Sequence, residues 1–334
     1  MVFLIQQTML YAVPLMVVAL AGVCAERSGI INLGLEGIMI FGAFTGVMFI
    51  RTMQGAGMTQ EQGQLMVILA LVGAGLCGVI FSLLLAFSAI NLKADQTIGG
   101  TALNMLSPAI VLFFIVLIAN QNSLKMLTGA AGGWFMIQAS DFGKEEGFTN
   151  PLMSILFDKI YLTTYICIII FVLVSVFLYK TKTGLRLRSC GENPQAAASL
   201  GINVFKMRYL GVMLSGFLAG IGGFQFALTI SNCTSNGAVA GYGFLALAVM
   251  IFGNWTPLNI AFCSILFGLF KCIAAVYATL DINGDGVYLL NEIGVSPYAY
   301  RLMPYVITLV VLAFTSKNSR VPKAEGIPYD KGAR

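Results

Sequence analysis

The polar stretch TGLRLRSCGENPQAAASLGI, residues 183–202, separates long apolar runs, and the contrast with its surroundings decides the fold. Apolar runs of about 20 residues, the length that crosses a bilayer, recur on both sides of it. Hydrophobic residues make up 58% of the 334 residues and charged residues only 10%, whereas soluble domains are about 45–50% apolar. The composition therefore excludes a soluble domain and predicts an all-α, polytopic membrane protein.

The lengths of the apolar runs predict about 8–10 transmembrane helices. Residues 128–139 leave the number open, because they fit either a re-entrant segment or an additional short span. The predicted spans are residues 3–24, 30–50, 64–90, 97–119, 160–180, 206–230, 241–255, 257–280 and 300–316.

The basic residues predict the orientation of these spans. Residues 180–208 carry six Lys or Arg against Glu192 alone, and the tail at 317–334 carries five against two acidic residues. Because basic loops stay in the cytoplasm, both segments are expected there. The slightly acidic segments 120–160 and 281–300 are expected outside, together with the N-terminus. The chain is thus predicted to be a membrane domain followed by a cytoplasmic tail, with the division at 1–316 and 317–334.

Several classes of function are excluded by residues that the sequence lacks. It has no histidine, which rules out hydrolases built on histidine chemistry. It has no GxxxxGK[ST] phosphate loop, so any ATP dependence must come from a partner chain. The seven cysteines form no CxxC pair and most lie in apolar runs, as small buried residues do. Transport rather than catalysis is expected, in contact with membrane lipid, with no cofactor on this chain and no nucleic-acid partner.

The polar stretch contains a helix-start pattern. Asn193 is a good capping residue and Pro194 suits the first helical position, while Gln195 and the alanines after it favour a helix that Gly201 ends. A short amphipathic helix between two spans, flanked by arginines, is either a docking element for a partner or a surface anchor.

The pattern Gln195-Ala196-Ala197, with Gly201 after it, resembles the EAA loop of ABC importer permeases, the coupling helix that fits a cleft of the ATP-binding subunit. The chain departs from that pattern, since Gln195 replaces the usual Glu and Gly-Val-Met-Leu at 211–214 replaces Ile-x-Leu-Pro. The resemblance implies a cytoplasmic coupling loop at 180–206. Its expected ATPase-coupling residues are Gly191, Glu192, Asn193, Pro194, Gln195, Ala196, Ala197 and Gly201.

Further motifs are ERSGIINLGLEG at 26–37, LSGFLAGIGG at 214–223, GFLALAVMIFGNWTP at 243–257 and LMPYVITLVVLA at 302–313. Together they resemble the permease family shared by ribose-type sugar, branched-chain amino-acid and purine-nucleoside importers, and are most similar to the shorter permease of the nucleoside group. The resemblance implies a type II ABC importer permease in the inner membrane of a bacterium. It also implies three partners: a cytoplasmic ATPase, a second and different permease, and an extracytoplasmic solute-binding lipoprotein.

Other interpretations remain open. A simple-sugar or branched-chain amino-acid permease would share the same architecture. A secondary transporter would also fit the composition, but it would carry its own ion-coupling site and need no docking helix, so the QAAASLG sequence argues against it. A structural scaffold would tolerate changes in that loop without a transport defect.

Two polar residues, Asn32 and Glu36, are expected at the start of the second span. Ionisable groups inside a membrane are costly and usually face a cavity or a partner. On a continuous helix the two residues share a face, where they would line the solute pathway. The alternative, which the family resemblance favours, is that Glu36 lies near the cytoplasmic interface and holds in shape a helix broken at Gly34 or Gly37.

Two more polar residues are expected within spans, Asn104 and Lys271. Lys271 lies too deep to reach the interface easily, so it is expected to pair with Glu36 or with the second permease. For Asn104 a hydrogen bond between helices is expected.

The loop DINGDGVYLLNE, residues 281–292, matches the EF-hand pattern for calcium. A short acidic loop without metal is the alternative, because Gly294 and Pro297 interrupt the helix that would follow. The candidate calcium ligands are Asp281, Asn283, Asp285 and Glu292.

Overall fold

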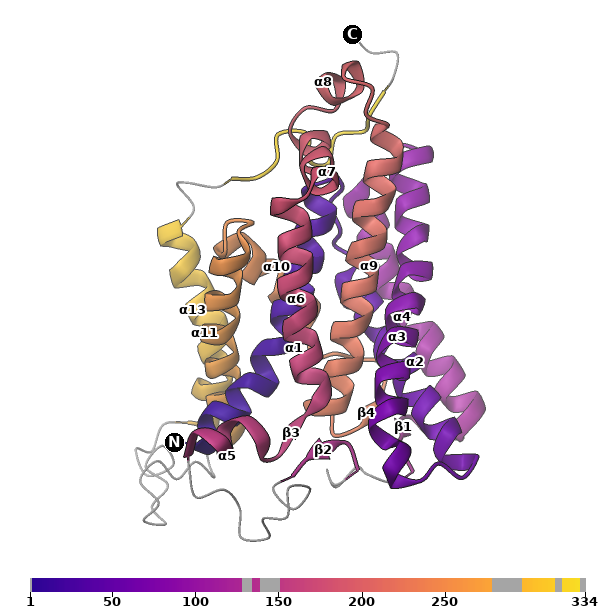
Figure 1. Cartoon of the computed structure of the whole chain (residues 1–334), viewed down its shortest axis with the longest axis vertical. Coiled ribbons are helices and arrows are strands. Elements are labelled where there is room, and N and C mark those ends of the chain that lie inside the picture. Colours follow the sequence, from indigo (N-terminus) through magenta and orange to yellow (C-terminus); the bar gives the residue numbers. More distant parts are fainter. Residues whose placement is uncertain (1, 128–133, 139–150, 278–295, 316–319, 331–334) are drawn as a thin grey trace.

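The computed structural model describes residues 2–127, 134–138, 151–277, 296–315 and 320–330. These residues form a bundle of long helices with four two-residue strands at one end (Figure 1). The helices are α1 (Val2–Glu26), α2 (Leu35–Gly55), η1 (Gln60–Gln62), α3 (Gly63–Ala86), η2 (Phe87–Asn91), α4 (Gln96–Ala119), α5 (Pro151–Phe157), α6 (Leu162–Lys180), α7 (Lys182–Glu192), α8 (Pro194–Ser199), α9 (Val204–Thr229), α10 (Tyr242–Phe252), α11 (Pro257–Val276) and α13 (Pro297–Thr315). The strands are β1 (Leu124–Lys125), β2 (Met136–Ile137), β3 (Ile160–Tyr161) and β4 (Thr234–Ser235).

Within the described residues, seven helical segments are long and apolar enough to cross a membrane. They are α1, α2, the continuous segment Gln60–Asn91, α4, α6, α9 and α11. This confirms the predicted all-α membrane protein. Residues 134–138, within the stretch proposed as a re-entrant segment or extra span, contribute β2, which pairs with β3.

The two ends of the bundle are different. Helices α7 and α8 lie at one end, called here the α8 end, and the described part of the tail crosses it (Figure 1). The N-terminus, α5 and the strands lie at the other end, called here the N-terminal end. This arrangement matches the one inferred from the charges, although the side of the membrane that each end faces stays a prediction.

Two predicted spans differ from the structure. The span predicted at 241–255 is the eleven-residue helix α10, which rises only about 16 Å, about half of a bilayer core. It cannot begin earlier because Ala240 and Gly241 both have left-handed backbone angles, with φ of 51° and 74°. The span predicted at 30–50 begins as α2 only at Leu35, so the chain before it is not helical.

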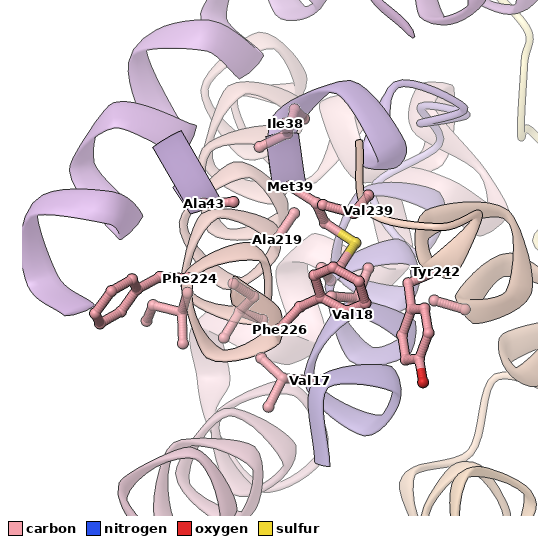
Figure 2. Close-up of a cluster of buried hydrophobic side chains, with 14 of the residues drawn as sticks. Val17, Val18, Ile38, Met39, Ala43, Ala219, Phe224, Phe226, Val239 and Tyr242 are labelled. Carbon is pink, nitrogen blue, oxygen red and sulfur yellow. The ribbon is translucent and has the colours of Figure 1, made fainter. Parts of the chain in front are cut away.

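The core lies where α1, α2 and α9 meet. Figure 2 shows Val17 and Val18 of α1, Met39 of α2 and Phe226 of α9 in one apolar cluster. The outer face of α4 is equally apolar but exposed, as expected for a surface against lipid. Its most exposed side chains are Ile98, Met105, Phe113 and Leu117, at 64% to 79%.

The two glycine-rich stretches in α3 and α9 pack against each other. A methyl group on Gly78 would lie 2.2 Å from the carbonyl oxygen of Gly216, and one on Gly220 would lie 2.3 Å from that of Ala74. Small residues allow such close approach between membrane helices. These glycines therefore serve helix packing, which positions the polar segments described next.

Candidate functional site

The short helix at the α8 end is built as its sequence predicts. The Asn193 side chain accepts a hydrogen bond of 3.0 Å from the Ala196 N–H, Pro194 takes the first helical position, and Gly201 follows with φ of 80°. The predicted helix start and stop are thus confirmed. Sequence reasoning missed α7, the amphipathic helix before it, which Thr181 caps through a hydrogen bond from the Gly184 N–H.

Helix α8 has one buried and one exposed side. Ala197 packs in a small cluster with Cys190 of α7, Val204 of α9 and Tyr329 of the tail. Gln195, Ala196 and Gly201 are exposed, and Leu200 is 81% exposed beside them. The helix therefore rests on three other parts of the chain and presents its remaining surface beyond the end of the bundle.

Residues 320–330, called here the tail strap, are bonded to the α8 end of the bundle. The Ala324 N–H donates to the Gly191 carbonyl at 2.9 Å, and Arg208 donates from Nη1 to the Ile327 carbonyl at 3.0 Å. The strap crosses the α8 end (Figure 1, yellow). Its basic residues predicted a cytoplasmic location and gave no sign of this packing, in which Tyr329 stacks edge-on against Phe205 with ring centres 5.4 Å apart.

A charged cluster joins the strap to the coupling loop. Arg27, directly after α1, forms an ion pair of 3.4 Å with Glu192 at the end of α7. Burial raises the pKa of the nearby Glu325 carboxyl in the strap to about 7, against the opposing effect of Arg27. Beside them the Trp255 indole donates to Glu26 at 2.5 Å. Of these residues only Glu192 was predicted, and the ERSG motif was the signal for Glu26 and Arg27.

The non-helical segment 27–34 lies inside the bundle and is held by side chains of α4. The Asn104 amide donates to the Leu33 carbonyl at 2.7 Å and accepts from the Gly37 N–H at 2.8 Å. Gln96 accepts from the Ile31 N–H at 2.7 Å. Backbone groups at membrane depth need such partners because no water is available. Asn104 thus forms a polar link between elements, as expected.

Asn32 and Glu36 do not form the predicted shared face. Asn32 precedes α2, so the helical spacing of four residues does not apply to it. Its amide donates to the Ser215 hydroxyl of α9 at 2.8 Å, and its oxygen accepts from the Gly34 N–H at 3.1 Å. The helix break therefore lies before α2, and Gly37 is inside the helix.

Glu36 caps another broken element, the half-length helix α10. Its two carboxylate oxygens accept hydrogen bonds from the Gly241 N–H at 2.9 Å and the Gly243 N–H at 2.6 Å. A carboxylate at a helix N-terminus is favoured by the helix dipole. Nearby Asn32 binds Ser215, which lies near the midpoint of α9, so this part of the chain is in the middle of the bundle. Glu36 is therefore a structural cap at half the depth of the bundle.

Lys271 lies near this cap. Its ammonium group is 5.4 Å from the centre of the Tyr242 ring, in the first turn of α10. Its charge also acts electrostatically on Glu36, so the two predicted residues belong to one neighbourhood. Lys271, Tyr242 and Tyr11 line a cavity of about 300 Å³.

The candidate calcium ligands Asp281, Asn283, Asp285 and Glu292 lie outside the described residues, and the calcium site stays a prediction. Among the residues that the structure does describe, no group of three or more His, Cys, Asp or Glu is arranged to hold a metal ion.

Comparison with known proteins agrees with this architecture. Residues 4–312 match the family described as branched-chain amino acid transport system / permease component. The guanosine ABC transporter permease protein NupQ of Bacillus subtilis is 38% identical, over 99% of this chain and 97% of its own. The nucleoside ABC transporter permease proteins NupC and NupB of Lactococcus lactis are 38% and 26% identical, over 98% and 77% of this chain and 96% and 68% of theirs.

No solved structure matches the chain. The family match covers nearly all the described helices, from α1 into α13. The chain therefore belongs to the permease family of the branched-chain amino acid transport systems and is a multi-pass membrane transport component.

Proposed function

We propose that the chain is one permease subunit of an ATP-driven nucleoside importer, which forms part of the solute pathway and receives a cytoplasmic ATPase at its α8 end. The ATPase is a separate chain, since this one has no phosphate loop. In this proposal the α8 end faces the cytoplasm, as the basic loop and tail predict.

The architecture of α8 carries the coupling part of the proposal. The helix is capped by Asn193 and packed on α7, α9 and the tail strap, while Gln195 and Leu200 are exposed. A partner that binds this surface contacts a helix that is packed on the rest of the chain. Movement of the partner is therefore passed from α8 directly to the long helix α9. The ion pair between Glu192 and Arg27 extends the same link to segment 27–34 at the centre of the bundle.

The relatives support nucleosides as the solute. Two permeases that are 38% identical along almost their whole length are named for guanosine and for nucleosides. NupB, a second nucleoside permease of the organism that has NupC, supports a pair of unlike permeases. A solute-binding lipoprotein at the N-terminal end would complete the importer.

Substitution of Gly201 tests the coupling role. Gly201→Asp adds a negative charge to the exposed end of α8, where the added Cβ would have no other atom within 4 Å. Gly201→Asn is the matched control, because Asn has nearly the same size and tolerates positive φ. We expect both variants to be inserted in the membrane, and Gly201→Asp alone to lose solute uptake while the ATPase continues to hydrolyse ATP. Normal uptake by Gly201→Asp would disprove docking at this surface.

A further inference from the structure

The cavity beside Glu36 lies in the part of the bundle nearer its N-terminal end. Its walls come from four parts of the chain: Tyr11 of α1, Ile230 directly after α9, residues around the start of α10, and the last turns of α11. Its volume of about 300 Å³ is at the lower limit of small-molecule sites, which span about 300–1,000 Å³. In the predicted orientation a solute arriving from outside meets this cavity before it reaches the middle of the membrane.

Lys271 gives the cavity a positive charge. It is the one charged residue of α11, a helix that is otherwise apolar apart from Asn259 and Ser264. A charge at membrane depth is costly and usually lines a pathway. The ammonium group offers three hydrogen-bond donors and no acceptor, so a solute atom that hydrogen-bonds to it must be an acceptor.

The aromatic wall is held in a fixed position. Tyr242 is 2% exposed and its ring lies 4.8 Å from that of Phe226. In Figure 2 its hydroxyl group points away from the apolar cluster. Because Glu36 accepts from the N–H groups of Gly241 and Gly243, on either side of Tyr242, the backbone that carries the ring is fixed.

Aromatic side chains and a donor cation together suit one kind of solute. A base stacks on an aromatic ring whatever its identity, and a guanine presents two acceptors, O6 and N7, that pair with Lys or Arg. A free sugar has no flat ring to stack. An amino acid would need an acidic partner for its ammonium group, and the carboxylate beside the cavity, Glu36, already accepts from two backbone N–H groups.

We propose that this cavity is a binding site for the purine base of the solute, in which Lys271, held over the Tyr242 ring, donates to the acceptor atoms of the base and Tyr11 contacts its ring. The proposal rests on the proposed nucleoside import. Glu36 acts here as a positioning residue, because it holds the start of α10 without contacting the solute.

The test measures kcat/KM for uptake of guanosine, 7-deazaguanosine, which lacks N7, and 2-aminopurine riboside, which lacks O6. The importer is reconstituted with its binding protein, and wild type is compared with Lys271→Met. Any selectivity of the binding protein is the same in both, so a change in the ratio of guanosine to analogue belongs to the permease. We expect that ratio to fall about tenfold in Lys271→Met for at least one analogue, the effect of losing a hydrogen bond to a charged donor.

Lys125→Met is the matched control, because Lys125 is exposed at the N-terminal end and does not line the cavity. It should keep the wild-type ratios. Tyr11→Leu provides an independent measurement, and we expect it to raise KM for guanosine about fivefold or more through lost ring contact.

The outcomes separate the two proposals. Absence of guanosine uptake by wild type would overturn nucleoside import itself. Guanosine uptake with the same ratios in wild type and Lys271→Met, or with an unchanged KM in Tyr11→Leu, would overturn the cavity proposal and leave nucleoside import standing.

Discussion

At the scale of single residues, the buried polar groups of this permease mainly satisfy backbone groups. Glu36 accepts hydrogen bonds from backbone N–H groups at the start of α10. Asn104 bonds to backbone groups on both sides of the start of α2, and Gln96 accepts from the Ile31 N–H. An unpaired backbone group at this depth costs several kcal/mol. These side chains therefore make it possible for the chain to be non-helical inside a membrane.

Glu36→Ala should destabilise the protein measurably. It leaves the N–H groups of Gly241 and Gly243 without their acceptors, at a cost of about 1–3 kcal/mol for each buried group. Glu36→Gln keeps one acceptor oxygen and should fall between Glu36→Ala and wild type. Thermal unfolding of the purified protein in detergent measures the order, and an unchanged Tm for Glu36→Ala would contradict the capping role.

At the scale of elements, the contact between α3 and α9 depends on the absence of side chains. Gly78→Ala would place a methyl group 2.2 Å from the Gly216 carbonyl oxygen, so we expect destabilisation of about 1–3 kcal/mol or more. Gly73→Ala, on the same helix, meets no atom within 4 Å and is the control. It should stay within about 1 kcal/mol of wild type. Equal stabilities of the two variants would contradict this packing.

The tail strap should attach more firmly at low pH. The pKa of Glu325 is raised from 4.5 to about 7 by burial, so the attached strap binds more protons than the released one between these values. Attachment is therefore strongest below about pH 4.5 and weakens as pH rises toward 7. The charged groups that act on Glu325 are Arg27 and Glu26, and Arg27 also pairs with Glu192.

Glu325→Gln removes this titration and keeps a neutral side chain. Hydrogen exchange of residues 322–329 in the variant should be slower than in wild type at pH 8, with little difference at pH 5. Because each comparison is made at one pH, the intrinsic exchange rate cancels. Faster exchange in Glu325→Gln at pH 8 would show that the carboxylate stabilises the attached strap.

At the scale of the whole molecule, the sequence predicted what depends on local patterns. Apolar runs located most spans within a few residues, and Asn193, Pro194 and Gly201 predicted α8. It did not predict that α10 is half a span or that the strap packs on the loop, since both depend on contacts between residues far apart in the chain. Glu36 was recognised as unusual, but its partners lie 205 and 207 residues away.

The ion pair between Arg27 and Glu192 illustrates the same limit. Each residue belongs to a motif that the sequence made visible, ERSG in one case and the coupling loop in the other. Only the fold brings the two motifs within 3.4 Å of each other. The link between the α8 end and the centre of the bundle therefore became visible only in three dimensions.

ATP-driven nucleoside import is tested most directly by the uptake of radiolabelled guanosine. Cells that produce this permease with its neighbouring genes are assayed before and after depletion of ATP, with ribose and leucine as parallel solutes. We predict guanosine uptake that stops when ATP is depleted. Uptake of ribose or leucine in place of guanosine would contradict the solute, and guanosine uptake that continues without ATP would contradict the mechanism.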